Sequence, residues 1–137
     1  KNNNDFYDDY AHHPTEISSV LEGVKKISNQ KEITTVFQPH RFSRVKLLNK
    51  EFSKAFKNSN KVILCPVYAA GEKINKNFNL FKFGKLISKN SGVLVIIIKN
   101  EEELKKYFKK NLTNNEVVIG MGAGSITNWM RNLIKIL

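Results

Sequence analysis

The chain has little cysteine, and this scarcity limits the classes of protein to which it can belong. Cys65 is the single cysteine in 137 residues, so an internal disulfide framework is ruled out and a reducing cytoplasm fits. Because Cys65 ends a short apolar run, we interpret it as a small buried side chain and not as a nucleophile.

Long apolar runs are also missing. The longest, residues 93–98, has the length of a strand, well short of the roughly 18 apolar residues that a membrane helix needs. Residues 1–5 are polar and do not resemble a signal peptide. We therefore expect no membrane partner. A length of 137 residues with 41% hydrophobic content predicts one domain, residues 1–137, with a sizeable core.

Positive charge is abundant, with a formal net charge of +11, but arginine is scarce. Clustered Lys and Arg would favour nucleic acid, because they release counterions from phosphates. Here the lysines are scattered from Lys25 to Lys135, and Lys, Asn and Ile are abundant together, as in a biased composition. We expect no nucleic-acid partner. A basic nucleic-acid-binding module stays the alternative, which a salt titration of oligonucleotide binding would test.

Apolar periodicity alternates between short β runs and helical stretches. This pattern predicts an α/β fold, a doubly wound, mostly parallel sheet with helices on both faces. Strands are expected near residues 5–9, 33–38, 62–66, 93–98 and 117–120, and helices near 15–27, 44–57, 80–89, 101–110 and 125–137. Ser43 is the expected cap of the second helix.

Two polar clusters, residues 8–16 and 38–44, follow the first two expected strands. Ligands of open α/β sheets bind beyond the carboxyl ends of the strands, so both clusters should face one crevice. Strand alternation sends only one of Asp8 and Asp9 inward. An acidic residue at such a position commonly accepts a hydrogen bond from a ribose hydroxyl.

Arg41 and Arg44 flank the start of the second expected helix, where the helix dipole disfavours cations unless an anion is bound. The planar guanidinium also matches a carboxylate or phosphate. These are two of only three arginines among 23 basic residues, since lysine occupies nearly every other basic position. We interpret them as an anion site; the alternative is a pair of solvated surface cations.

His12 and His13 stand before the first expected helix, with Pro14 forcing His13 into an extended conformation. Neighbours on an extended chain point apart, so one imidazole should face the crevice while the other packs or caps, and no metal site is expected. Residues 120–125 form a glycine-rich turn without a dinucleotide fingerprint or a phosphate-loop lysine. It is interpreted as a tight turn that lets the backbone approach a ligand. The loop at residues 66–72 either shapes the pocket or merely turns.

Four segments together resemble a known family. They read Asp-Asp-Tyr-Ala-His-His-Pro-Thr-Glu, Phe-Gln-Pro-His-Arg-Phe-Ser-Arg, Val-Tyr-Ala-Ala-Gly-Glu and Gly-Ala-Gly-Ser-Ile, at residues 8–16, 37–44, 67–72 and 122–126. In this order they closely resemble the C-terminal domain of the Mur ligases, and the resemblance covers nearly the whole chain. It implies a Rossmann-like fold. Family members also carry an N-terminal UDP-sugar domain and a central ATPase domain, which would be missing here.

The resemblance is to the family branch that joins L-alanine to UDP-N-acetylmuramate in peptidoglycan precursor synthesis, in the bacterial cytoplasm. It implies that ATP phosphorylates the lactyl carboxylate and that the alanine amine then attacks the acyl phosphate. The implied partners are UDP-N-acetylmuramate, L-alanine, ATP and the protein's own missing domains. ATP and magnesium would serve the full-length enzyme, with none bound tightly to this chain alone.

By motif match, Asp9 and Tyr10 resemble the ATP-binding residues of the family. His12, Arg41, Arg44 and Ser125 resemble the residues that bind the amino acid. The match implies no certain catalytic residue and no metal ligand in this domain. No Gly-x-x-x-x-Gly-Lys-Ser/Thr motif occurs, so the isolated chain should be inactive.

A related ligase that recycles murein tripeptide is the enzymatic alternative. Its second motif reads more like Glu-Pro-Arg-Ser, whereas this chain has Gln-Pro-His-Arg at residues 38–41. This difference favours alanine addition.

Overall fold

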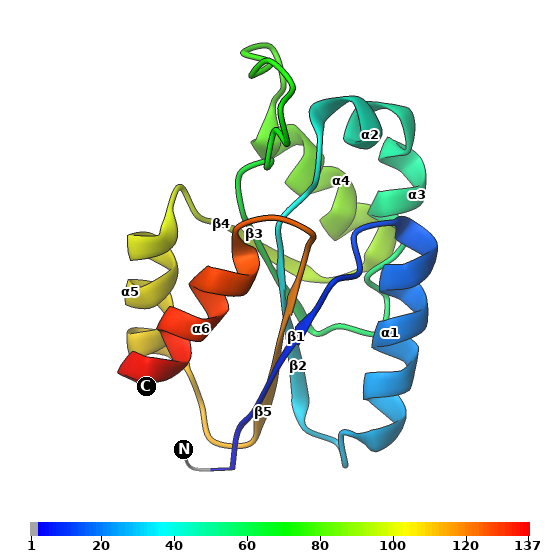
Figure 1. Ribbon diagram of the computed structural model, residues 1–137. Coiled ribbons are helices and arrows are strands. Elements are labelled where there is room, and N and C mark those ends of the chain that lie inside the picture. Colours follow the sequence, from blue (N-terminus) through cyan, green and yellow to red (C-terminus); the bar gives the residue numbers. More distant parts are fainter. Residues whose placement is uncertain (1–2) are drawn as a thin grey trace.

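The computed structural model describes residues 3–137, which form one five-stranded parallel sheet with helices on both faces (Figure 1). The strand order is β1-β5-β2-β3-β4, and every neighbouring pair is parallel. The strands are β1 (Asp5–Asp9), β2 (Glu32–Phe37), β3 (Lys61–Leu64), β4 (Leu94–Ile97) and β5 (Glu116–Met121). The expected α/β fold is confirmed, and within the described residues the sheet is entirely parallel.

Six helices within residues 3–137 connect and cover the strands. They are α1 (Pro14–Ile27), α2 (Phe42–Leu47), α3 (Asn49–Ser53), α4 (Leu80–Ser91), α5 (Glu101–Asn111) and α6 (Ile126–Ile136). The chain moves in one direction along the sheet from β2 to β4 and then reverses to insert β5 between β1 and β2. Because parallel crossovers are right-handed, this reversal moves α5 to the opposite face from α4.

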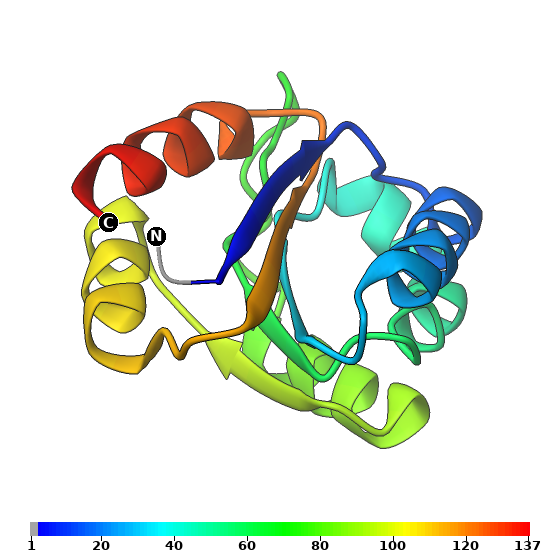
Figure 2. The same ribbon diagram turned by 90° about the horizontal axis from the view of Figure 1, so that it is seen from below.

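The view from below shows α5 and α6 on one side of the sheet and α1, α3 and α4 on the other (Figure 2). Within the described residues, two apolar clusters pack between the sheet and these two helix layers. The larger cluster packs Leu21 of α1, Phe52 of α3 and Ile87 of α4 against one face. The smaller packs Leu104 of α5 and Met130 of α6 against the other. Burial on both faces explains why β3 and β5 are apolar after their first residue, whereas β1 at the margin of the sheet is more exposed and carries three aspartates.

The second helix is where the sequence-based prediction was wrong. A single helix over residues 44–57 was expected, but the chain forms α2 and α3, separated at Leu48 (φ −110°, ψ 25°). Val45 and Phe52 both face the core, so the apolar periodicity continues across the break and conceals it. Ser43 does not cap the helix. Arg41 occupies the N-cap position, and the Ser43 hydroxyl donates to the Glu72 carboxylate instead.

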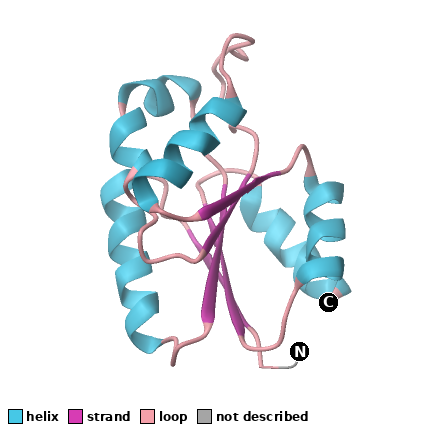
Figure 3. Ribbon diagram, turned by 180° about the vertical axis from the view of Figure 1, so that it is seen from behind, coloured by secondary structure: helices cyan, strands magenta, loops and turns pink. Residues whose placement is uncertain are grey.

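The other elements lie close to their predicted positions because their ends carry ordinary capping residues. Pro14 opens α1, and the Asn79 and Asn100 side chains cap α4 and α5 by accepting from Lys82 N and Glu103 N. Gly92 ends α4 at φ 68°, a conformation that favours glycine. Viewed from behind, the strands lie between helices on both sides (Figure 3).

Candidate functional site

The carboxyl ends of β1, β5 and β2 finish at the same level. Met121 is the register partner of Asp9 on one side and of Phe37 on the other. Backbone hydrogen bonds then join the following loops: Gly122 N donates to Asp9 O at 3.2 Å, and Gln38 N donates to Met121 O at 3.0 Å. The two polar clusters therefore converge at one edge of the sheet, as the sequence predicted, and the glycine turn joins them there.

Asp9 and Tyr10 lie at the end of β1. Asp9 is half-buried, and its Oδ1 atom accepts from Ala11 N at 2.8 Å, whereas neighbouring Asp8 is exposed. Tyr10 is 70% exposed. A shallow hollow of about 420 Å³ beside both residues continues along α1 past Thr15. The predicted division between the two aspartates is confirmed.

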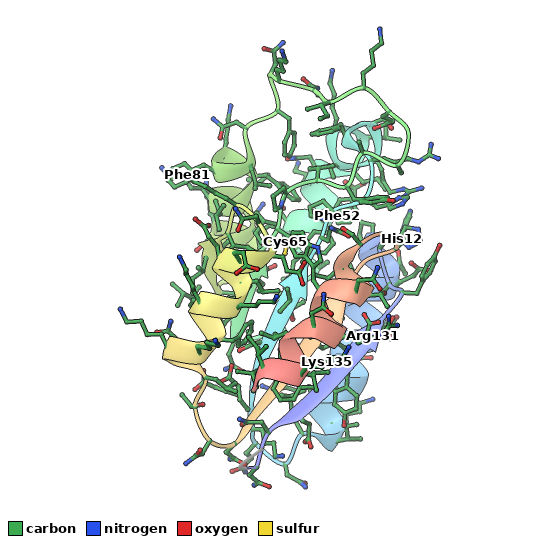
Figure 4. The ribbon with its side chains drawn as sticks, turned by 60° about the vertical axis from the view of Figure 1, so that its left-hand side comes forward. His12, Phe52, Cys65, Phe81, Arg131 and Lys135 are labelled. Carbon is green, nitrogen blue, oxygen red and sulfur yellow. The ribbon has the colours of Figure 1, made fainter. Side chains whose placement is uncertain are left out.

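His12 is the histidine that turns toward the other motifs, and His13 is exposed (Figure 4). His12 Nδ1 lies 3.0 Å from the Tyr10 carbonyl oxygen, which can only accept, so Nδ1 carries the hydrogen. The His12 ring centroid lies 5.4 Å from that of His40. Glu16 accepts from the backbone amides of His12 and His13, at 3.3 and 3.2 Å. Both bonds lower the pKa of the Glu16 carboxyl, and the bond from His12 has the larger effect.

Contacts join Arg44 in α2 to His40 in the loop before it, and His40 to Tyr68 in the loop after β3. Arg44 Nη1 lies 3.0 Å from His40 Nδ1. A guanidinium can only donate, so His40 Nδ1 accepts and carries no proton. The His40 ring stacks on Tyr68 with centroids 5.6 Å apart and an interplanar angle of 21°. Burial, followed by the charges of His12, Arg44 and Arg41, lowers the pKa of His40.

Arg41 begins α2 with an exposed side chain and a positive φ of 70°. Its amide donates to Tyr68 O at 2.8 Å, and Tyr68 N donates to Pro39 O at 2.8 Å. A positive φ is uncommon for a residue with a side chain and costs free energy unless the surroundings fix it. The paired backbone bonds to the Tyr68 loop provide that fixation.

Ser125 lies beside Gln38 at the start of α6. Gln38 Nε2 donates to Ser125 Oγ at 2.8 Å, and Gln38 Oε1 accepts from Ile126 N at 3.1 Å. Gln38 is buried, at 3% exposure. This buried amide therefore connects the second motif to the glycine turn. Sequence reasoning did not assign Gln38 a role, and a polar residue directly after the apolar strand was the available signal.

Side chains of the same chain occupy the space beside the glycine turn, so Gly122 and Gly124 leave no room for a Cβ. A Cβ on Gly122 would lie 2.9 Å from Ile126 Cγ2, and one on Gly124 would lie 2.5 Å from Tyr68 Cγ. The group that approaches Gly124 is thus a tyrosine ring of the same chain. The loop at residues 66–72 helps to build the site, which answers the question that its sequence left open.

The same loop is anchored a second time near Arg41. Glu72 accepts from Ser43 N at 3.3 Å and from the Ser43 hydroxyl. The hydroxyl bond is the main cause that lowers the pKa of Glu72. The loop is therefore held to the start of α2 at two points, by the Tyr68 backbone and by the Glu72 side chain. Sequence reasoning assigned no role to His40, Tyr68 or Glu72, because the contacts of Tyr68 with His40 and of Glu72 with Ser43 join different motifs.

Other parts of the described chain offer less chemistry. Cys65 is fully buried, which raises the pKa of its thiol and agrees with a packing role. Residues 3–137 contain no group of three or more His, Cys, Asp or Glu side chains that could hold a metal ion. None of the described helices is both long and apolar enough to cross a membrane. A larger hollow of about 910 Å³, beside Phe78 and Lys82, contains none of the predicted site residues.

The family profile "Mur ligase, glutamate ligase domain" matches residues 1–124. This chain belongs to that family. It is 49% identical over 132 residues to the UDP-N-acetylmuramate–L-alanine ligase of Pelagibacter ubique, covering 96% of this chain and 28% of that protein. It is 41% identical over 137 residues to the ligase of the same name from Hydrogenobaculum, covering 98% and 29%.

Solved structures agree with this family membership. UDP-N-acetylmuramate-alanine ligase from Thermotoga maritima superposes with a TM-score of 0.73 at 26% identity, over 96% of this chain and 26% of that one. A murein peptide ligase from Psychrobacter arcticus superposes with a TM-score of 0.75 over 98% of this chain and 27% of that one. At 15% identity, the second likeness shows the fold alone. The chain spans less than a third of these relatives and matches their C-terminal part.

Proposed function

We propose that this chain is the C-terminal domain of an ATP-dependent ligase that joins L-alanine to UDP-N-acetylmuramate. The observation that carries the proposal is the convergence of His12, Arg41, Arg44 and Ser125 with Asp9 at one sheet edge, where the loops are joined by backbone bonds. Relatives that are 49% and 41% identical and bear this ligase name support it.

Asp9 and Tyr10 form the nucleotide side of the proposed site. Asp9 Oδ1 is engaged by Ala11 N, and no partner among the described residues 3–137 engages Oδ2. A carboxylate oxygen at the end of a parallel strand suits a ribose hydroxyl. The exposed Tyr10 ring borders the same hollow of about 420 Å³, so these residues fit the ribose of ATP.

His12, Arg41, Arg44 and Ser125 form the amino-acid side. The arginines supply planar donors for the alanine carboxylate. Ser125 Oγ accepts from Gln38, so its own hydrogen can be donated to the same anion. His12 uses Nδ1–H on the Tyr10 carbonyl, so Nε2 of the neutral ring can accept from the alanine ammonium group.

The domain contributes position and charge to the reaction. When bound, ATP supplies the phosphoryl group that activates the lactyl carboxylate, and the alanine amine displaces phosphate from the resulting acyl phosphate. Holding the amine near the activated carboxyl replaces a bimolecular encounter with a pre-oriented one. The arginines also offset negative charge near the reacting carbonyl. No residue of this chain is assigned to magnesium, and a cytoplasmic location remains a prediction.

The murein tripeptide ligase is the second candidate, and the His40–Arg44 contact disfavours it. His40 belongs to the Gln-Pro-His-Arg segment and supplies the acceptor for Arg44 at 3.0 Å. The Glu-Pro-Arg-Ser pattern of the tripeptide ligase has no histidine to supply this acceptor. The geometry therefore supports alanine addition.

The test is ligation by the full-length protein that contains this domain. With ATP and UDP-N-acetylmuramate, it should use L-alanine far better than murein tripeptide, and the isolated residues 1–137 should give no product. Serine and glycine in the same assay would rank its amino-acid preference. Use of the tripeptide without use of alanine would contradict the proposal.

A further inference from the structure

His40 occupies the centre of the candidate site but belongs to neither proposed ligand set. It touches three motifs. Its Nδ1 accepts from Arg44 Nη1 at 3.0 Å, its face stacks on Tyr68, and its ring centroid lies 5.4 Å from that of His12. An isolated bridge between His40 and Tyr68 also pairs their backbones. These contacts fix the orientation of the His40 ring, and the hydrogen bond to Nδ1 then fixes the orientation of the Arg44 guanidinium.

Tyr68 is fixed in turn by the glycine turn. The position that a Cβ would take on Gly124 lies 2.5, 2.6 and 2.8 Å from three atoms of the Tyr68 ring. The Tyr68 ring therefore packs against position 124, where only glycine leaves room for it. Gly124 directly precedes Ser125. Its backbone is bonded to Pro39 O and Arg41 N, both at 2.8 Å.

The geometry points to His40 and Tyr68 as positioning residues, which hold the Arg44 guanidinium toward the amino-acid substrate and are themselves seated on Gly124. This inference rests on the proposed function and adds to it how Arg44 is oriented. Arg44 has a long, flexible side chain, and one of its donors is occupied by His40 while the others can bind a carboxylate. Fixing the side chain before binding removes part of the entropy cost of binding the substrate.

The hydrogen bond between Arg44 and His40 also makes the orientation of Arg44 sensitive to pH. Only neutral His40 can accept from Arg44. The groups that face His40 are His12 from the β1–α1 loop, Arg41 and Arg44 from the start of α2, and Glu72 and Tyr68 from the loop after β3. Burial and the nearby cations lower the pKa of His40, so neutral His40 persists below the usual histidine range of about 6.5. Only at lower pH should protonation release Arg44 and weaken alanine binding.

The first experiment uses His40→Phe in the full-length ligase, because phenylalanine keeps an aromatic ring but removes the acceptor. The KM for L-alanine should rise about tenfold, as expected for the loss of a hydrogen bond to a charged group. The KM for ATP and kcat should stay within about twofold, since His40 touches neither nucleotide nor reacting atoms in this account. His13→Phe, at an exposed histidine of the same sheet edge, is the matched control.

A double-mutant cycle then separates positioning from a merely structural role. If His40 acts through Arg44, the variant that combines His40→Phe with Arg44→Lys should show no larger alanine KM than Arg44→Lys alone. Additive effects on the alanine KM would overturn the inference, and so would an unchanged alanine KM in His40→Phe.

The pH profile gives a readout that does not depend on the phenylalanine variant folding. Asparagine at position 40 offers an acceptor near the Nδ1 position but does not titrate. Between about pH 8 and about pH 5, the alanine KM of the wild type should rise further than that of His40→Asn. Identical profiles would overturn the inference while leaving the proposed function standing. Failure of the wild type to ligate alanine at any pH would overturn both.

Discussion

The two edges of the sheet use charged and polar residues in opposite ways. At the amino edge, Glu116 is 1% exposed, and its carboxylate is fully engaged. Thr113 N and Oγ1 donate to Oε1 at 3.2 and 2.9 Å, while Oε2 accepts from Thr34 Oγ1 and lies 3.9 Å from Lys61 Nζ. At the carboxyl edge, Asp9 and Arg44 are half-buried and are only partly engaged by the protein.

On the proposed function, the fold places stabilising polar contacts at one edge and binding groups at the other. A buried carboxylate is tolerated only when its oxygens are paired. Both oxygens of Glu116 have partners within the protein, and these contacts join β5 to β2 and β3. Polar groups at the opposite edge keep donors and acceptors available, which is what a ligand requires. Substitutions at the two edges should therefore have different consequences: loss of folding stability at one and loss of substrate affinity at the other.

Glu116→Ala should have the largest effect. Removing the carboxylate leaves Thr34, Thr113 and Lys61 without their partner, and breaking such a buried cluster costs about 3 kcal/mol or more of unfolding free energy. Urea denaturation of the purified chain would measure it. Glu32→Ala, an exposed glutamate on the neighbouring strand β2, should change the unfolding free energy by less than about 0.5 kcal/mol. An equal loss of unfolding free energy in both variants would contradict a special stabilising role for the buried Glu116 cluster.

Gly124→Ala should come next and should affect the carboxyl edge. The added methyl group would overlap the Tyr68 ring, which is 39% exposed and can swing outward, so the stability cost should be about 1 kcal/mol. His40 would then lose its stacking partner. The alanine KM of the full-length ligase should rise several-fold, and thermal melting with kinetics would measure both effects.

Gly23→Ala is the matched control for this substitution. Gly23 lies on the exposed side of α1 with nothing within 4 Å of an added Cβ. Alanine should stabilise the helix by about 0.5–1 kcal/mol and leave the kinetics unchanged. A similar alanine KM in both glycine variants would argue against the role of the Tyr68 contact.

Asp9→Asn should have a smaller and more selective effect. Asparagine keeps an oxygen for Ala11 N but removes the charge offered to the ribose, at a cost of about 1 kcal/mol. The KM for ATP should rise about fivefold, with little change in the alanine KM. Asp8→Asn, at the exposed neighbour, should leave both values unchanged; equal effects of the two substitutions would assign Asp9 no special role.

Sequence patterns predicted β3 and β5 well because these strands are buried on both faces and are apolar after their first residue. The Leu48 break was missed because Val45 and Phe52 keep helical spacing across it. The sequence could predict that Asp9, His12, Arg41 and Arg44 lie together, because they stand at or just after the ends of parallel strands; their binding roles stay predictions. The contacts of His40 and Tyr68 could not be predicted, since Gly124 lies far from Tyr68 in sequence and meets it only in the folded chain.

The most direct test of the account is the alanine KM of the full-length ligase carrying Arg41→Lys. The charge stays, but a point ammonium cannot reproduce the planar fork, so the alanine KM should rise about tenfold to a hundredfold. Arg131→Lys, at an exposed arginine of α6 bonded only to Asn128 among the described residues, should leave it unchanged (Figure 4). The melting temperature should barely move in either variant. A wild-type alanine KM in Arg41→Lys would contradict the claim that the carboxyl edge of the sheet binds the amino acid.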